Sequence, residues 1–370
     1  MEQERYIETG KSSFYGDYLY DQIVPQDNFL RKLRQTIPWE RFTRKLIKLY
    51  KGGGMYGRPP FDPALVLKME LITHLYQLSE RQVEAYVNDN LSAKYFIGLA
   101  VDQKAPDHTT LSKFRERLIK NGNLAAFEEM LTEILRIACE SGIQFGSIQI
   151  VDSVHSIANV NTRKDESRQK KGKGPHDPDA HWGVKHTRKV KDEDGQQVEQ
   201  PEYFFGYKAH VSMNAETGLI TSLEVTSGEA YDGKYFIPLI KHDLQQKLPV
   251  DTVTADKAYD DGENHYFLEI NGLHSAIRLK KTRTQKKDKN KQVWLDLRDT
   301  PQYQQGLLER YKIERKFGEA KKWHGFGQCR YLGRVKYAVQ AFLTAMVLNL
   351  KRLIKLLTGV GFRDQSASLV

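Results

Sequence analysis

Residues 148–153 read Ile-Gln-Ile-Val-Asp-Ser, and residues 250–256 read Val-Asp-Thr-Val-Thr-Ala-Asp. Each stretch is a short apolar run with an acid at its end, which predicts a buried β-strand. A single Asp at a strand end is weak evidence for a site, because many such residues form turns or caps. Two of them on parallel neighbours of one mixed sheet would meet at the same sheet edge. We therefore take Asp152 and Asp256 as candidate partners in one site.

A third acid lies on a predicted helix over residues 308–321. Arg310, Glu314 and Lys321 are spaced by four and seven residues, which places them within about 40° of one another on one helical face. Glu319 points to the opposite side by the same count. Glu314 is therefore the better third carboxylate. The alternative is that Glu314 only forms a salt bridge with Arg310 on the solvent-exposed surface.

Three carboxylates around one point predict a metal-dependent site. Mg²⁺ and Mn²⁺ prefer oxygen ligands, and Mg²⁺ combines a few carboxylates with water and substrate phosphate. Two such ions activate an attacking oxygen on one side of a phosphorus and stabilise the leaving oxygen on the other. We predict two ions held by Asp152, Asp256 and Glu314 as catalytic residues. Arg310 and Lys321 would hold phosphate oxygens or balance charge.

The chain divides by pattern into an N-terminal helical region, 1–145, and an α/β region, 146–358, followed by a tail, 359–370. Asp62 with Pro63, and the capping box that starts at Ser79, mark helix starts in the first region. Five strands are expected in the second region, at 147–152, 204–212, 219–226, 250–256 and 274–279, with a hairpin between the second and third. Two strongly charged segments, 163–200 and 280–298, are expected to be exposed loops or insertions.

Charge and composition restrict the class of partner. The formal net charge is +10 and 39% of residues are hydrophobic, as in a globular protein that binds a polyanion. The two cysteines, Cys139 and Cys329, support neither a zinc site nor a disulfide framework. A reducing cytoplasmic compartment fits, and the polar start predicts no signal peptide. The apolar stretch 337–357 is too polar to span a membrane.

Several basic residues are candidates for contact with DNA. A helix from about Thr109 carries Lys113, Arg115 and Arg117, and could be the reading helix of a helix-turn-helix or contact phosphates by charge alone. The alternative is a solvated basic face. Lys257 and Tyr259 flank Asp256 and could touch phosphate, with local packing as the alternative.

Four histidines could suggest a metal site. His176, His181 and His186 are spaced by five residues, which fits no standard ligand pattern. We interpret their segment as a solvated or DNA-contacting loop. His155 follows Asp152 by three residues and is either close to the metal ions or used in packing.

At these residues the chain resembles the DDE transposases of bacterial insertion sequences, in the insertion-sequence-five group. The resemblance covers nearly the whole chain and depends on the order of several phrases. These are residues 61–63 (Phe-Asp-Pro), 78–82 (Leu-Ser-Glu-Arg-Gln), 96–99 (Phe-Ile-Gly-Leu), 106–115 (Pro-Asp-His-Thr-Thr-Leu-Ser-Lys-Phe-Arg), 151–153 (Val-Asp-Ser), 205–210 (Phe-Gly-Tyr-Lys-Ala-His), 255–260 (Ala-Asp-Lys-Ala-Tyr-Asp), 313–318 (Ile-Glu-Arg-Lys-Phe-Gly) with Lys321, 324–325 (His-Gly) and 349–352 (Asn-Leu-Lys-Arg). Arg310, Glu314 and Lys321 match the third catalytic segment, whose Tyr position is Leu307 here.

The resemblance implies an RNase H-like core, a mixed sheet with helices. It implies cleavage at the ends of a mobile element, which yields 3′-hydroxyls that attack target DNA. It also implies double-stranded DNA as the partner, both terminal inverted repeats and target, and a homodimer on paired ends.

Three functions remain open at this point. The first is an active transposase. The second is a DNA-binding regulator that derives from a transposase and has lost catalysis, and the third is an RNase H-like nuclease that cuts without rejoining. The intact set Asp152, Asp256 and Glu314 favours the first, and the helical N-terminal region argues against a simple nuclease.

Overall fold

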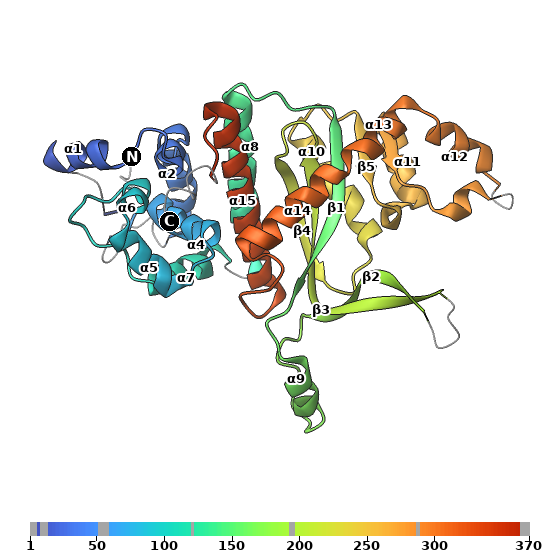
Figure 1. Ribbon diagram of the computed structural model, residues 1–370, viewed down its shortest axis with the longest axis horizontal. Helices are drawn as coiled ribbons and strands as arrows, with labels where there is room; N and C mark the ends of the chain where they lie inside the picture. Colours follow the sequence, from blue (N-terminus) through green and yellow to red (C-terminus); the bar gives the residue numbers. More distant parts are fainter. Residues whose placement is uncertain are drawn as a thin grey trace. The chain divides into compact units, whose positions relative to one another are not determined.

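The computed structural model describes residues 6–7, 14–50, 59–119, 122–191, 197–285 and 289–362, with the side chains of residues 14–15, 17, 186–191 and 197–199 left out. The chain forms two compact units, which we treat separately (Figure 1). Met1–Ile143 and Phe342–Val370 make the helical unit, and Gln144–Ala341 make the sheet unit.

The helical unit is built around α4 (Pro63–Leu75), in which every residue is buried. Asp62 caps this helix by accepting a hydrogen bond from the Ala64 amide, and Pro63 fills the first helical position. Ser79 and Gln82 close the predicted capping box of α5. The remaining helices of this part are α1 (Phe14–Ile23), α2 (Phe29–Thr36), α3 (Glu40–Leu46), η1 (Ile47–Leu49), α5 (Glu80–Asp89), α6 (Leu91–Ile97), α7 (Thr109–Leu118) and α8 (Ala125–Glu140).

The last helix, α15 (Arg334–Thr358), contributes to both units. From Phe342 onward it belongs to the helical unit, where Phe342 stacks on Phe127 of α8 with 6.2 Å between ring centroids. Beyond the helix, Phe362 packs edge-on against Phe29 and Tyr76. This division departs from the predicted boundary at residue 358. The reason is that the apolar face of α15 finds its partners among helices more than 200 residues earlier.

The sheet unit contains a six-stranded mixed sheet in the order β2-β3-β1-β5-β6, with β4 paired to β3. β1 is central, antiparallel to β3 and parallel to β5, and β5 is parallel to β6. The strands are β1 (Ile148–Ile157), β2 (His181–Lys191), β3 (Gln197–Asn214), β4 (Ile220–Ser227), β5 (Thr252–Ala255) and β6 (His274–Ile277). A mixed sheet with flanking helices, in a chain that also contains an all-helical unit, is the RNase H-like α/β class expected from the sequence. The predicted hairpin is β3 and β4.

Helices pack on the sheet and carry parts of the site. One core cluster joins Val151, Val253 and Ile277 of the strands to Phe236 and Leu268 of the helices. α13 is so close to the sheet that a Cβ on Gly306 would lie 2.4 Å from that of Ala276. The helices of this unit, apart from α15, are α9 (Thr162–Gln169), η4 (Asp232–Tyr235), α10 (Phe236–Gln245), η5 (Lys257–Tyr259), α11 (Gly262–Ile270), η6 (Lys281–Thr284), α12 (Lys291–Arg298), α13 (Pro301–Glu309) and α14 (Tyr311–His324).

The two charged segments are more structured than predicted. The segment 163–200 holds α9, β2 and the start of β3, and the segment 280–298 holds η6 and α12. In the first, backbone pairing between β2 and β3 forms a ribbon that does not require an apolar face. In the second, Trp294 packs on His265 and under the Arg283 guanidinium. The sequence did not predict these helices and strands, because a high density of charged residues is typical of exposed loops.

Candidate active site

The sheet register brings the two aspartates together. Val151 of β1 lies beside Ala255 of β5 in parallel pairing, so Asp152 and Asp256 follow at adjacent positions. Asp256 comes directly after its strand, as predicted, and it also caps η5 by accepting a hydrogen bond from the Lys257 amide. Asp152 instead lies in the middle of its strand, because β1 continues to Ile157 along β3, which is antiparallel to it.

Arg310 is the point on which the three predicted carboxylates converge. It lies at the junction of α13 and α14, and its guanidinium nitrogens are 3.7 Å from an Oδ of Asp152 and 3.7 Å from an Oδ of Asp256. Glu314, in the first turn of α14, has an Oε 4.0 Å from the same guanidinium. Glu319 faces elsewhere and lies 3.8 Å from Lys316. The helix register argued from spacing therefore puts Glu314, and not Glu319, beside the aspartates.

The environment of Asp152 is unfavourable to an uncompensated negative charge. Desolvation raises its pKa to about 7, and the nearby Asp256 and Asp232 act in the same direction. The Ser153 amide, 2.8 Å from Oδ1, and Arg310 oppose this rise in the pKa. A site of this kind favours a bound cation. The side chain of Glu314 is 64% exposed, which leaves one side of the site open to solvent.

A fourth acid, Asp232, borders the site and was missed from the sequence. It lies in η4, accepts a hydrogen bond from the Ser153 hydroxyl at 3.1 Å and pairs with Lys208 at 2.8 Å. Lys208 and the buried His210 are two residues apart on β3 and therefore lie on the same face of the sheet. Two ionisable residues at this spacing on a predicted strand were a signal that the sequence contained. Asp232 and Lys208 therefore lie next to Asp152, to which Ser153 connects them.

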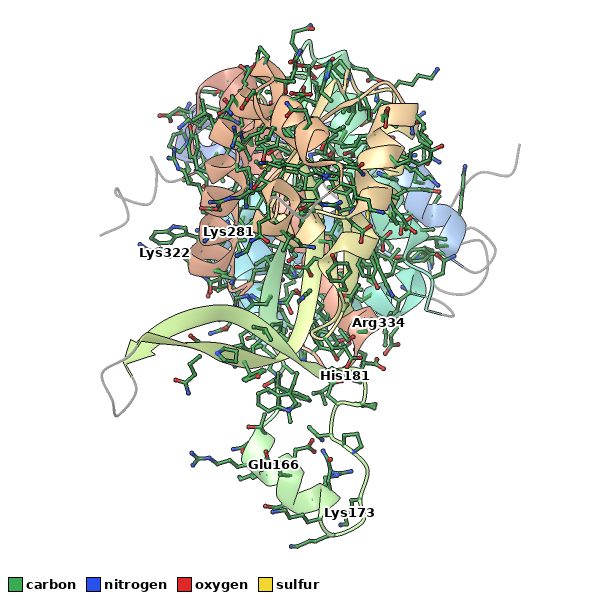
Figure 2. The ribbon with its side chains drawn as sticks, turned by 90° about the vertical axis from the view of Figure 1, so that its right-hand side faces the viewer. Glu166, Lys173, His181, Lys281, Lys322 and Arg334 are labelled. Carbon is green, nitrogen blue, oxygen red and sulfur yellow. The ribbon has the colours of Figure 1, made fainter. Side chains whose placement is uncertain are left out.

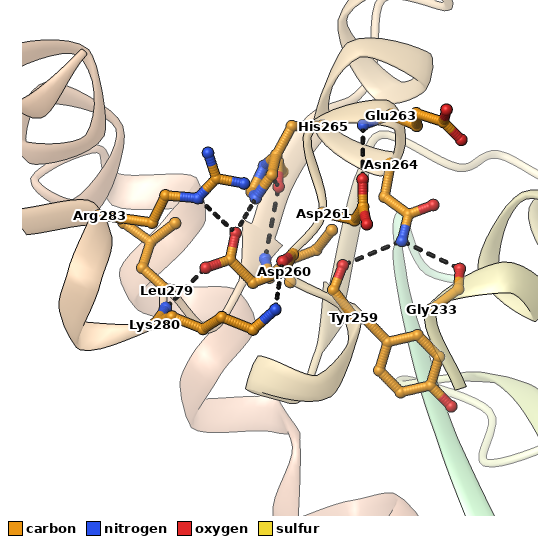
Figure 3. Close-up of polar contacts among 12 residues, drawn as sticks. Gly233, Tyr259, Asp260, Asp261, Glu263, Asn264, His265, Leu279, Lys280 and Arg283 are labelled. Atoms are coloured by element: carbon orange, nitrogen blue, oxygen red, sulfur yellow. Dashed lines mark hydrogen bonds and ion pairs between the residues drawn. The ribbon is translucent and has the colours of Figure 1, made fainter. Parts of the chain in front are cut away.

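Asp260 ties the segment that follows Asp256 to the insertion that follows β6 (Figure 3). Its Oδ1 accepts hydrogen bonds from His265 Nε2 at 3.0 Å and Arg283 Nε at 3.2 Å, and its Oδ2 accepts one from the Lys280 amide at 2.7 Å. Desolvation raises its pKa, but the hydrogen bonds from His265 and Lys280 and the charge of Arg283 outweigh it, so the pKa lies below the ordinary value. The turn after Asp256 is thereby fixed.

Two of the predicted DNA-contacting residues are inside the protein. Tyr259 is fully buried and packs against Phe236, so contact with phosphate is wrong and the local-packing alternative holds. Arg115 is buried in ion pairs with Glu70, at 2.6 Å, and with Glu80. It holds α7 to its neighbours and cannot reach DNA. Periodicity alone could not place it, because the partners come from other helices.

Lys113, Arg117 and Lys257 are exposed. The Arg117 guanidinium lies over the Tyr50 ring at 4.5 Å and, with Lys45 and Lys48, lines a cleft of about 460 Å³ in the helical unit. Arg117, Lys45 and Lys48 form a basic surface that α7 shares with α3 and η1.

Lys321 and the histidines have separate surroundings. The Lys321 ammonium is 3.4 Å from His155 Nε2, and desolvation together with Lys185 lowers its pKa. His155 also packs on Phe204. His181 lies 3.2 Å from Glu229, His176 donates its amide to Asp165, and the side chain of His186 is outside the described residues.

Among the residues that the structure describes, one group of three acids and histidines has its ligand atoms within 4.8 Å of one another, namely Glu84, Asp107 and His108. Glu84 Oε2 accepts hydrogen bonds from the amide and Nδ1 of His108, and Asp107 accepts one from the Thr109 amide. These contacts fix the start of α7. Asp152, Asp256 and Glu314 are more widely spaced, because they surround the Arg310 guanidinium.

Comparison with known families identifies the family of the chain. Residues 148–350 match the family model described as a transposase DDE domain, which covers more than half of the chain. The chain belongs to the DDE transposases. Residues 18–117 also match a transposase domain, DUF772. The protein is thus a DNA transposase of the DDE type, an endonuclease class that depends on metal ions and acts on DNA, and a regulator without catalysis is not favoured.

Solved structures of transposases are similar over most of this DDE transposase. The piggyBac transposase synaptic complex with hairpin DNA is 9% identical over 96% of this chain and 78% of that one, with a TM-score of 0.38. The Mos1 mariner paired end complex with Mn is 14% identical over 95% and 94%, with a TM-score of 0.21. Among the described residues, no helix is long and apolar enough to cross a membrane.

Proposed function

We propose that Asp152, Asp256 and Glu314 are the catalytic carboxylates of this transposase and hold two Mg²⁺ or Mn²⁺ ions. The observation that carries the proposal is the convergence of all three side chains on Arg310, each within 4.0 Å of its guanidinium. Three oxygen donors around one cationic group, with a raised pKa at Asp152, fit hard divalent cations. When bound, the ions would activate the attacking oxygen and stabilise the leaving oxygen.

The chain's own residues would do the positioning. Arg310 would neutralise the carboxylates and then hold a phosphate oxygen of the scissile strand, which suits its forked donors. Lys321 and Lys257 would bind neighbouring phosphates. Glu314 lies on the open side of the site, from which DNA would approach. Asp232 would keep Ser153 and the middle of β1 in place.

We propose that the substrate DNA is the pair of terminal inverted repeats of an insertion sequence, followed by target DNA. The exposed Lys113 supplies charge for end binding, as do Arg117, Lys45 and Lys48, which line one cleft. A homodimer would hold the two ends, so that cleavage and strand transfer are coupled. The site of action would be the bacterial nucleoid, where such DNA is found.

The test uses purified protein and a labelled duplex that carries the element ends. Mg²⁺-dependent nicking is expected for the wild type and is expected to vanish in Asp152→Asn, while end binding remains. Asp251→Asn, an exposed acid one residue before β5, is the matched control and should cleave normally. Binding without cleavage in Mg²⁺ or Mn²⁺ would favour a regulator, and cleavage without joining would favour a nuclease.

A further inference from the structure

The segment between β1 and β2, residues 158–180, forms a projection that we call the arm. It consists of α9 and the turn that returns from it, and it stands clear of the sheet in both views of the molecule (Figures 1 and 2). Glu166 and Lys173 mark its outer part in Figure 2. The catalytic role of the sheet does not require such a projection, so its surface calls for a separate explanation.

The outer surface of the arm carries more excess positive charge than the sequence of the arm does, because two of its acids are buried. Its two buried acids, Asp165 and Asp177, are 6% and 1% exposed. Glu166 and Asp179 are the acids that remain at the surface. All six bases are exposed, and they are Arg163, Lys164, Arg168, Lys170, Lys171 and Lys173.

The buried acids hold the arm in one conformation. Asp165 accepts hydrogen bonds from the His176 amide at 2.8 Å and from the Gln169 side chain at 2.9 Å, which folds the return turn against α9. Asp177 accepts one from the Tyr207 hydroxyl at 2.7 Å and one from the Gly333 amide at 3.2 Å. The arm is therefore anchored to β3 and to the start of α15, within the sheet unit.

The bases gather along α9 and the turn that follows it. At 100° per residue, Lys164 and Arg168 of α9 lie within about 40° of each other, and Lys171 lies in the turn after the helix. Neither Lys164 nor Lys171 forms an ion pair with any residue in the described part of the chain. Exposed cations without acidic partners on one projecting segment suit the phosphates of a nucleic acid backbone.

The distance from the catalytic carboxylates limits where that backbone can be. The cap residue Asn161 follows Asp152 by nine residues, mostly along β1. An extended chain covers about 3.3 Å per residue, so the helix of the arm begins at most ~30 Å from Asp152. At ~3.4 Å per base pair, this corresponds to roughly nine base pairs of duplex.

We propose that the arm binds the phosphate backbone of duplex DNA up to about one helical turn from the scissile phosphate. The proposal rests on the proposed function only in taking the element end as the DNA. A second copy of the chain is the competing partner, since the nearby ribbon exposes Trp182, Val184 and Tyr203. The charge of the arm favours DNA, because a second copy is itself strongly basic, with a net charge of +10.

The test compares Lys164→Gln/Lys171→Gln with Glu166→Gln, a matched change of opposite sign on the same arm. Binding is measured as a function of salt on two duplexes, one that ends about four base pairs from the cleavage position and one that extends about 20 base pairs on both sides. On the long duplex the double variant should bind roughly tenfold more weakly, with a salt slope reduced by about two, while Glu166→Gln binds as tightly or more tightly. On the short duplex all three proteins should bind equally.

Equal affinities on both duplexes would overturn the proposal. So would unchanged binding to a single end combined with loss of the paired-end complex, an outcome that would assign the arm to a protein contact. Nicking of the saturated short duplex by the double variant should match the wild type. If wild-type protein binds but does not nick in Mg²⁺, the proposed function fails while the arm result stands.

Discussion

At the scale of single residues, the site depends on which side of α14 faces the strands. Glu314 and Glu319 are five residues apart on one helix, and only Glu314 lies beside Arg310 and the aspartates. Glu319 pairs with Lys316. The two residues have the same side chain on the same helix, so substitutions at both positions test whether the position beside Arg310 is what matters.

We expect Glu314→Gln to lower cleavage by at least a hundredfold, because a neutral amide cannot replace a carboxylate ligand of a divalent cation. Binding to element ends should change less than threefold. Glu319→Gln should retain cleavage within a few fold of the wild type. The assay is single-turnover nicking with saturating protein, and a dead Glu319→Gln with an active Glu314→Gln would show that the assignment is wrong.

Asp243 is a second residue whose surroundings have a measurable consequence. It lies fully buried in α10, and its Oδ2 accepts a hydrogen bond from the Ser212 hydroxyl at 2.6 Å. Burial raises its pKa to about 7. The folded protein thus binds a proton at pH 5 to 6 that the unfolded chain, with a pKa of about 3.9, does not bind.

Stability should therefore fall as pH rises from about 4 to about 7 and then level off, by roughly 1.4 kcal/mol for each unit of pKa difference. Asp243→Asn cannot ionise, so its midpoint of thermal unfolding should exceed that of the wild type at pH 8 and approach it at pH 4.5. Thermal melts of both proteins across this range test the sign. A wild-type curve that rises between pH 5 and 7 relative to the variant would contradict it.

At the scale of elements, α13 is the helix that positions the site. It packs on β5 and β6, and its end passes directly into Arg310 and α14. The close approach is possible because Gly306 has no side chain. Gly318, in the middle of α14, has nothing within 4 Å of an added Cβ. An alanine at Gly306 would therefore report mainly on packing against the sheet, and an alanine at Gly318 mainly on helix propensity.

We predict that Gly306→Ala destabilises the protein by roughly 1–3 kcal/mol through overpacking against Ala276, and slows cleavage because Arg310 and Glu314 move with α13. Gly318→Ala should instead be neutral or stabilise the protein by up to about 1 kcal/mol, as expected for Ala in an open helix position. Chemical denaturation gives both values. If the two substitutions have the same effect, the close contact with the sheet does not limit the position of α13.

At the scale of the whole molecule, the helical unit is not contiguous in sequence. Its α8 buries Phe127 and Met130, and its last part comes from residues 342–362, through Phe342 and Phe362. A fragment that ends at 143 would expose the apolar surface that this last part covers.

We expect residues 1–143 alone to unfold without cooperativity and to bind a dye for exposed apolar surface. The same fragment joined by a flexible linker to residues 342–362 should unfold in one sharp transition. Calorimetry of both fragments decides the matter, with Phe342→Ala in the joined fragment as the control for the stacking on Phe127. A cooperative transition in the short fragment would mean that α8 does not need α15.

The sequence by itself determined the fold class, the strand that ends at Asp256, the caps at Asp62 and Ser79, and the spacing that puts Arg310 and Glu314 on one helical face. Each of these follows from interactions within a few residues, or from a period that the chain displays directly. The expectation that net positive charge favours a polyanionic partner also needs only composition.

Tertiary structure alone decided which side chains are covered. Arg115 and Tyr259 look accessible in a linear pattern, and both are buried because Glu70 and Phe236 come from other elements. The same holds for the extension of β1 past Asp152, which depends on antiparallel pairing with β3, and for the division of α15 between two units. Burial depends on partners that are distant in sequence, and no local pattern of residues specifies where those partners will be.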